Sequence, residues 1–319
     1  MALDPARRAQ LNLAKLTALA KSAGANGLTP LGFPGGAAAF GDPAFGQTVL
    51  WVLTEQPALG GALAVALKDD VPERLVVITD DARDAGVIAR RATYFASPAT
   101  IDVASVDATS LVWASPGGLA PREDAHSDVD VPPGVDVVHE HGVTRFEVKG
   151  LEIGRIVDGV IAVGVGKHDR EAHLMANSGS TLADLAARVR KERRYDAPGG
   201  AMTSYARERW LRSIAVARPE LVGVGPLTPV APPLPRADLR DAGIAPAVGD
   251  GVVVAFSVGV DPDLVPSAAD ARALYAPDAE LVLVVPEADA LPNSYRLAAA
   301  LNQPARIVTV RNDWPALGD

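Results

Sequence analysis

Polar side chains that could carry out chemistry are concentrated in one segment, Val135–Met175. Four of the five histidines of the chain lie there, together with several acidic residues. Within the segment, Asp136 precedes a Glu-x-Lys pair formed by Glu147 and Lys149. Hard carboxylate oxygens suit Mg²⁺, and phosphodiester hydrolysis requires metal-assisted activation of water. Asp136, Glu147 and Lys149 are therefore the candidate catalytic residues of a metal-dependent nuclease.

The histidines suggest a second kind of site, in which imidazoles and carboxylates hold a metal. His139 and His141 should point to the same side of one strand, and the run His168–Glu171 should begin a helix. Two imidazoles and a carboxylate could bind Zn²⁺, Mn²⁺ or Fe²⁺. The alternative is that these side chains cap the helix or form surface hydrogen bonds. The candidate metal ligands are His141, Glu152, His168 and Glu171.

A third interpretation is binding through basic helices. One predicted helix places Leu182, Leu185 and Val189 on one side and basic residues on the other, and the next helix, from near Thr203, should expose Arg212 and its basic neighbours. The region is basic, although the whole chain has a net charge of −9. Such faces could contact nucleic acid, a nucleotide or an acidic partner, or could simply be solvated. The candidate nucleic-acid-binding residues are Arg188, Arg190, Lys191, Arg193, Arg194, Arg207 and Arg209.

The elements that should position these residues form an antiparallel meander followed by helices. Val135–Val138 predicts a strand, and Thr144–Ile156 alternates polar and apolar residues, with the Glu-x-Lys pair on one face. A change of phase at Gly150 predicts a bulge or bend within that strand. Asp158-Gly159 predicts a two-residue hairpin turn that leads into a strand at Val160–Val165.

This order of strands and helix resembles the core of the PD-(D/E)xK nuclease superfamily. The resemblance implies that Asp136 and Glu147 hold a divalent metal and that Lys149 polarises the phosphate or the attacking water. A second registration places the acidic position at Asp158 and the Glu-x-Lys strand at Val163–Lys167, where no acid stands at the Glu position. Under that registration, the resemblance implies a nuclease-like fold with a degraded metal site.

Two βαβαβ segments, which we expect to be Rossmann-like, flank this centre. Short apolar strands joined through helices indicate parallel pairing, so the predicted fold class is α/β with an inserted α+β domain. The two segments could share one sheet or form two small domains. We favour their association, because three strands alone bury little surface. The strands are predicted at Val49–Leu53, Leu75–Thr79, Ile101–Val106, Val252–Phe256, Leu281–Val285 and Ile307–Val310.

Stretches rich in Gly, Pro and acidic residues separate these parts. Residues 2–22 predict an amphipathic helix, and Gly27–Gly46 should be an irregular connector. The predicted parts are the N-terminal helix and connector (1–46), the first βαβαβ segment (47–114), an acidic linker (115–133), the central domain (134–225), a Pro-rich linker (226–250) and the second βαβαβ segment (251–319).

Composition excludes several classes of function. The chain contains no cysteine, so it has no disulfide, thiolate metal site or cysteine nucleophile of its own. It shows neither a signal-peptide pattern nor an apolar run near the ~20 residues of a membrane span, so we expect a cytoplasmic protein. The Gly-rich dinucleotide fingerprint is missing, which disfavours a nicotinamide cofactor. Ser257–Asp263 follows a predicted strand and is a secondary candidate site, because ligands of open α/β sheets bind at strand carboxyl ends.

The chain also resembles a family of uncharacterised actinobacterial proteins in four segments: GVTRFEVKGLEIGRI, VGVGKHDREA, YARERWLRSIAVARPELVG and FSVGVDPDLVPSAADARA. The resemblance extends from about Val49 to Val310 and brings no known activity. Members of that family often lack a basic residue where Lys149 stands, whereas Glu147, Glu152 and the His168–Glu171 run match.

Overall fold

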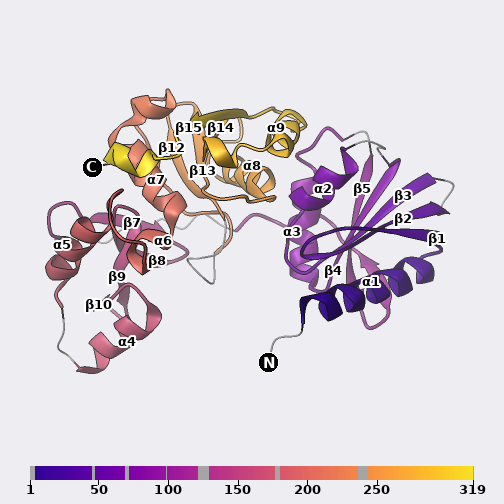
Figure 1. Ribbon diagram of the computed structural model, residues 1–319, viewed down its shortest axis with the longest axis horizontal. Helices are drawn as coiled ribbons and strands as arrows, with labels where there is room; N and C mark the ends of the chain where they lie inside the picture. The colour runs from indigo at the N-terminus through magenta and orange to yellow at the C-terminus, as the bar shows by residue number, and fades with distance from the viewer. Residues whose placement is uncertain are drawn as a thin grey trace. The chain divides into compact units, whose positions relative to one another are not determined.

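The computed structural model describes residues 4–44, 47–68, 72–97, 99–120, 129–176, 180–235 and 243–318. The chain divides into two compact units (Figure 1). The first unit consists of Met1–Leu119 and Pro292–Pro304, and the second of Ala120–Leu291 and Ala305–Asp319. The described part is mixed α/β, with three separate sheets. No helix in this described part is both long and apolar enough to cross a membrane.

The first unit is built on a six-stranded sheet of order β1-β2-β3-β4-β5-β6. The three central strands β3, β4 and β5 are parallel, as the apolar runs predicted, and the outer strands pair antiparallel. Helix α1 covers one face, where Leu16 and Leu19 pack against Trp51. The elements are α1 (Pro5–Ser22), β1 (Asn26–Leu31), β2 (Gly36–Ala44), β3 (Gln47–Thr54), α2 (Gly60–Ala66), β4 (Arg74–Thr79), α3 (Ala82–Ala92), β5 (Thr100–Asp107), β6 (Ser110–Trp113) and α9 (Pro292–Ala299).

The expectation of an irregular connector at Gly27–Gly46 is wrong, because β1 and β2 occupy most of it. The small residues that suggested a loop are required by the close packing of the sheet. Ala37 and Ala39 lie in the core beside α1. A Cβ added at Gly36 would meet the carbonyl oxygen of Leu53 at 1.9 Å. Gly and Ala therefore mark a tightly packed strand here rather than a loop.

A four-stranded antiparallel sheet of order β10-β9-β8-β7 forms the first half of the second unit. Its apolar face carries Phe146, Val148 and Ile153 and packs against Leu185 and Val189 of α5. The elements are β7 (Asp136–Glu140), β8 (Val143–Val148), β9 (Leu151–Val157), β10 (Val160–Val163), α4 (Lys167–Ala176), α5 (Leu182–Glu192) and α6 (Ala201–Ser204).

The strands of this sheet are joined by three two-residue turns: His141-Gly142, Lys149-Gly150 and Asp158-Gly159. In each turn both residues have positive φ, which is the requirement of a type I′ hairpin. The turn at Asp158-Gly159 is confirmed. The single bent strand predicted over Thr144–Ile156 is wrong, because the chain reverses at Lys149-Gly150 and β8 pairs with β9. The register of the β8–β9 pair does shift, between Phe146 and Glu147, but not at Gly150.

A five-stranded sheet of order β11-β12-β13-β14-β15 completes the second unit. Strands β13, β14 and β15 are parallel, as predicted, whereas β12 was missed because it lies in the Pro-rich stretch taken as a linker. The two sets of parallel strands therefore lie in different sheets. The elements are α7 (Arg207–Ala217), η1 (Pro219–Val222), β11 (Thr228–Pro229), β12 (Ala245–Gly249), β13 (Val252–Phe256), α8 (Leu264–Tyr275), β14 (Glu280–Pro286), η2 (Glu287–Asp289), β15 (Arg306–Val310) and η3 (Trp314–Gly318).

Candidate ligand-binding site beside a charged sheet face

The second face of the four-stranded sheet is charged and buried against helix α7. Asp136 pairs with Glu147 in the β7–β8 register, and Glu140 lies two pleats from Asp136 on the same face. Arg209 of α7 donates to both glutamates, from Nη1 to Glu147 Oε1 at 2.5 Å and from Nη2 to Glu140 Oε2 at 2.6 Å. Arg212, one helical turn later, donates to Glu147 Oε2 at 3.2 Å. Both carboxylates are thus neutralised by arginines within the fold.

Arg212 also joins this charged face to the five-stranded sheet. Its Nη1 donates to the carbonyl oxygens of Val230 and Pro246, each at 3.3 Å. Only 2% of the Arg212 residue surface is exposed, so its hydrogen bonds are protected from water. Helix α7 therefore fixes the two sheets of the second unit to one another through one guanidinium.

A second cluster of ion pairs surrounds Glu152 on β9. Its carboxylate accepts from Arg145 at 2.6 Å and from Arg155 at 2.6 Å, and it pairs with Arg170 of α4 at 3.2 Å. Arg145 also approaches Glu140 at 3.6 Å, which links the two clusters. Three buried glutamates of the sheet are therefore neutralised by arginines from both strands and helices.

Burial and charge act in opposite directions on these carboxyl groups. Burial raises the pKa of Glu140, but Arg209, Arg212 and Arg145 outweigh it, so the net pKa is lowered. Burial also opposes ionisation of Glu152, and its arginine partners again lower the net pKa. For Glu147, burial prevails and the pKa is raised, despite Arg209 and Arg212. The arginine partners, and not solvent, therefore favour the charged state of Glu140 and Glu152.

Arg193 is fully buried and holds the loop between α5 and α7. Its guanidinium donates to four carbonyl oxygens and lies 4.6 Å from the ring centroid of Trp210. The acceptors are Lys149 O at 2.9 Å, Met202 O at 2.5 Å, Tyr205 O at 2.9 Å and Ala206 O at 2.9 Å. The prediction that Arg193, Arg209 and Arg212 are exposed is therefore wrong. In all three, the side chain satisfies buried acceptors of the protein.

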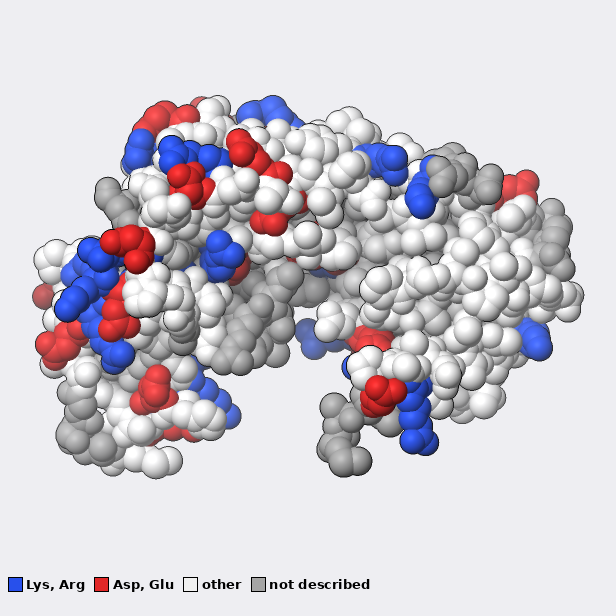
Figure 2. Space-filling model, viewed as in Figure 1, with Lys and Arg blue, Asp and Glu red and all other residues white. Residues whose placement is uncertain are grey.

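The other predicted nucleic-acid-binding residues remain on the surface. Arg188 donates to Glu192 at 2.8 Å and Arg194 pairs with Asp196 at 3.3 Å. Arg207 lies over the ring of Trp314, 5.6 Å from its centroid. Arg190 and Lys191 are also exposed. Basic and acidic atoms consequently interleave over α5, as Figure 2 shows, so the helix is less uniformly basic than its sequence suggested.

The candidate metal ligands do not converge. His141 stands in a hairpin turn with φ +50°, so it does not share a strand face with His139 as predicted. The His168 side chain is 97% exposed and approaches Glu171, at 3.6 Å. Glu152 is enclosed by its arginines. Within the described ranges, no group of three or more His, Cys, Asp or Glu could hold a metal ion.

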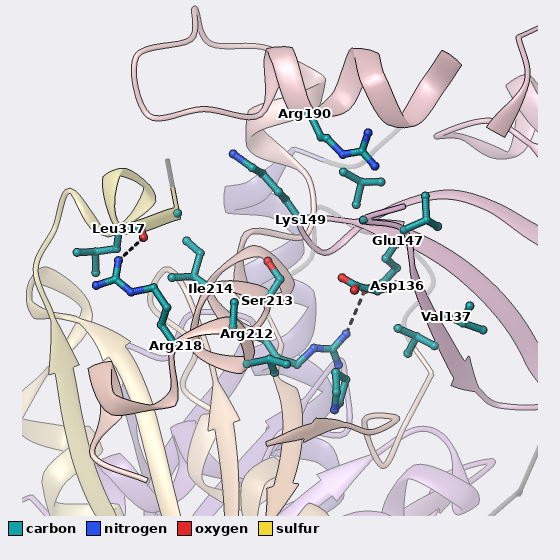
Figure 3. A pocket seen from close by; sticks show the side chains of 18 residues that line it. Asp136, Val137, Glu147, Lys149, Arg190, Arg212, Ser213, Ile214, Arg218 and Leu317 are labelled. Atoms are coloured by element: carbon teal, nitrogen blue, oxygen red, sulfur yellow. Dashed lines mark hydrogen bonds and ion pairs between the residues drawn. The ribbon is translucent and has the colours of Figure 1, made fainter. Parts of the chain in front are cut away.

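The three candidate catalytic residues, in contrast, line one cavity of about 790 Å³. Asp136 and Glu147 come from neighbouring strands, and Lys149 from the turn that follows (Figure 3). Both oxygens of Glu147 are already hydrogen-bonded to arginines, and Lys149 Nζ donates to Arg193 O at 3.1 Å. A divalent ion at Glu147 would have to displace Arg209 and Arg212. The trio is brought together, with both oxygens of its glutamate already bound by arginines.

The sequence did not indicate which other polar residues line this cavity. They are Arg190 of α5, Arg212 and Ser213 of α7, and Arg218 just beyond α7. Arg190 was singled out, but as part of a helix face. Arg212 and Ser213 become neighbours of β7 only through tertiary packing, for which the sequence carries no local signal. The spacing of Arg209 and Arg212, three residues apart on a helix, indicated a shared face but not its partner.

The remainder of the cavity wall is apolar. Ile214 and Val216 of α7, Pro229 of β11 and Leu317 of η3 contribute to it. Asp136 is exposed at this wall, where desolvation raises its pKa against the opposing charge of Arg212. In the secondary candidate loop after β13, Gly259 N donates to Asp289 at 2.7 Å.

Comparison of the chain with family models, curated proteins and solved structures found no match. The chemistry of this cavity is therefore the basis on which its function can be inferred.

Proposed function

We propose that the second unit binds a small anionic ligand in the cavity between α5, α7 and the β7–β8 hairpin. The observation that carries this proposal is the convergence of Lys149, Arg190 and Arg218 on one cavity with an apolar wall. Arg212 and Glu147 also line it, but they compensate one another. Asp136 is the remaining acid, so the cavity has an excess of cationic groups.

The size and lining of the cavity support a small molecule. Its volume of about 790 Å³ lies within the range of roughly 300–1,000 Å³ that is usual for ligand pockets. Such pockets combine an apolar wall with a few polar groups that orient the ligand. Guanidinium groups favour carboxylate and phosphate, which they can bind through two parallel hydrogen bonds.

The cationic groups retain donors for a ligand. Arg190 is exposed and uses Nη2 to donate to Pro133 O. Arg218 donates from Nη1 to Leu317 O at 2.9 Å, and its Nε contacts Glu220 at 3.5 Å. A guanidinium has five N–H donors, so these contacts orient each group without exhausting it. The protein contacts thus preorganise the cations that the ligand would meet.

Replacing Arg190 by glutamine should weaken binding of the ligand by about tenfold or more, because a charged hydrogen bond contributes about 1.5–3 kcal/mol. Arg188→Gln is the matched control, since Arg188 lies on the same helix, is exposed and pairs with Glu192 instead of lining the cavity. Thermal shift would identify ligands among inorganic phosphate, mononucleotides and dicarboxylates, and calorimetry would measure their affinities. Equal losses in the two variants would refute a specific role for the cavity.

Replacing Asp136 by asparagine should strengthen anion binding at neutral pH, because it removes the acid that repels the ligand. The pKa of Asp136 is raised by desolvation, so its charge is lost as the pH falls through that raised value. The advantage of Asp136→Asn should therefore be largest above this pKa and vanish below it, where the wild-type side chain is also neutral. Calorimetric titrations over a pH series, with a ligand whose own charge is constant, would measure the effect. A pH-independent advantage would contradict it.

Nucleic acid is the second ligand class that the sequence suggests. The exposed residues Arg188, Arg190, Lys191, Arg194 and Arg207 are the groups that would contact its phosphates. Such binding would weaken steeply with salt and would respond equally to Arg188→Gln and Arg190→Gln, because surface phosphate contacts are distributed. Titration with single- and double-stranded oligonucleotides at low salt distinguishes the two ligand classes. We favour the small anion, because two of the seven predicted cations are buried and Arg188 and Arg194 are paired.

A further inference from the structure

The cationic groups of the cavity lie at two separate edges. Lys149, in the β8–β9 turn, and Arg190, on α5, form one edge. Arg218 follows the end of α7 and forms the other edge beside Leu317, to which it donates. Figure 3 shows Ser213 and Ile214 between these two edges. A compact anion at one edge would therefore not reach the cationic group at the other edge.

The middle of the cavity offers no cation for an anionic group. Arg212 reaches this region, but its guanidinium is committed to Glu147 and to two backbone carbonyls. The Ser213 hydroxyl donates its hydrogen to Trp210 O at 2.8 Å, so it presents an acceptor to the cavity. Asp136, which also lines the cavity, would repel a negative charge placed near it. The apolar side chains Ile214 and Val216 suit an uncharged segment instead.

Resting on the proposed function, we infer that the ligand is an elongated molecule with two anionic end groups (a dianion in this sense), each a carboxylate or phosphate, and an uncharged, largely apolar segment between them. One end group would bind Lys149 and Arg190, and the other Arg218. Each guanidinium can bind a planar carboxylate or a tetrahedral phosphate by donating two parallel N–H hydrogen bonds. Because binding at the second edge would be intramolecular once the first is occupied, the two contacts should reinforce one another when the ligand length matches their separation.

The test is a calorimetric comparison of dicarboxylates with monocarboxylates of equal chain length. The series runs from succinate to sebacate, against butyrate to decanoate, with alkyl bisphosphates as the phosphate-ended arm. We expect an optimum length at which the dianion binds about tenfold or more tightly than its monoanion, in one or both dianion arms. Both Arg190→Gln and Arg218→Gln should remove this advantage, Arg218→Lys should retain part of it, and Arg188→Gln should leave it unchanged. Thermal melting of each variant checks that the fold is intact.

The outcomes separate this inference from the function on which it rests. Monoanions that bind as tightly as dianions at every length, with Arg218→Gln without effect, would overturn the dianion inference and leave anion binding in the cavity standing. Absence of binding for dicarboxylates, bisphosphates, inorganic phosphate and mononucleotides alike would overturn the proposed function itself.

Discussion

Replacing Arg209 by methionine is expected to destabilise the second unit by about 3–5 kcal/mol, because it leaves buried carboxylates without their main partner. Arg209 donates to Glu140 and Glu147, and each of the three residues exposes 5% of its surface or less. The glutamates hold the pKa of Arg209 above its usual value, although burial lowers it, so the group stays charged. Urea unfolding, followed by the fluorescence of Trp210 and Trp314, would measure the loss.

Three comparisons show whether the loss comes from unpaired charge. Arg207→Met, on the same helix, removes an exposed side chain that lies over the Trp314 ring, and should cost about 1 kcal/mol or less. Adding Glu140→Gln and Glu147→Gln to Arg209→Met should recover part of the stability, because the two carboxylates that Arg209 had paired are then absent. The penalty of Arg209→Met should also shrink as the pH falls through the lowered pKa of Glu140, because below it both carboxyls are protonated and need no counter-charge. A penalty that is unchanged at low pH would point to lost packing instead.

Replacing Gly150 by alanine is expected to destabilise the second unit by more than about 4 kcal/mol, among the largest effects of single substitutions. Gly150 has φ +73°, and a Cβ at this position would meet the backbone carbon and oxygen of Arg209 at 2.3 Å. The third contact is Trp210 N, at 2.6 Å. Helix α7 lies directly against this turn, so the clash can be relieved only by moving the helix away from the sheet. Urea unfolding and near-UV circular dichroism would measure the change.

Gly159→Ala is the matched control for this substitution. Gly159 is the second residue of the next hairpin turn in the same sheet and has φ +77°, but a Cβ there would meet nothing within 4 Å. It should therefore cost only the backbone strain of about 1–2 kcal/mol. The difference between the two variants isolates the contact of the hairpin with α7. Equal effects would mean that α7 does not pack on Gly150 in solution.

The sequence predicted most of the parallel strands and helices, because each is encoded by a local apolar period. The strands that were not predicted have a composition that is typical of loops and linkers. The Gly- and Ala-rich β1 and β2 resembled a loop, and β12 begins with Ala245-Pro246, in a stretch read as a linker. Lys149-Gly150 was read as a bend because polar and apolar residues continue to alternate on either side of the turn. Local periodicity does not distinguish a bulged strand from two strands joined by a short hairpin.

The candidate site was predicted only in part, since its chemistry depends on contacts distant in sequence. Asp136, Glu147 and Lys149 were candidate residues on the evidence of the segment itself, but the sequence did not predict that they line one cavity. Their partners were not predicted, because Arg209 and Arg212 approach the sheet from a helix about 60 residues further along the chain. Because of those arginines, Glu147 is interpreted as the acceptor in a buried ion pair and not as a metal ligand.

A titration of the isotope-labelled protein with the tightest-binding dicarboxylate, followed by NMR, tests anion binding in the cavity most directly. We predict saturable chemical-shift changes for the Arg190 guanidinium and for the backbone amides of Asp136, Lys149 and Ser213. The signals of the Arg188 guanidinium should not change. We also predict that Arg190→Gln weakens the same shifts. Saturable shifts confined to residues outside this cavity, or no shift at saturating concentrations of the acid, would contradict it.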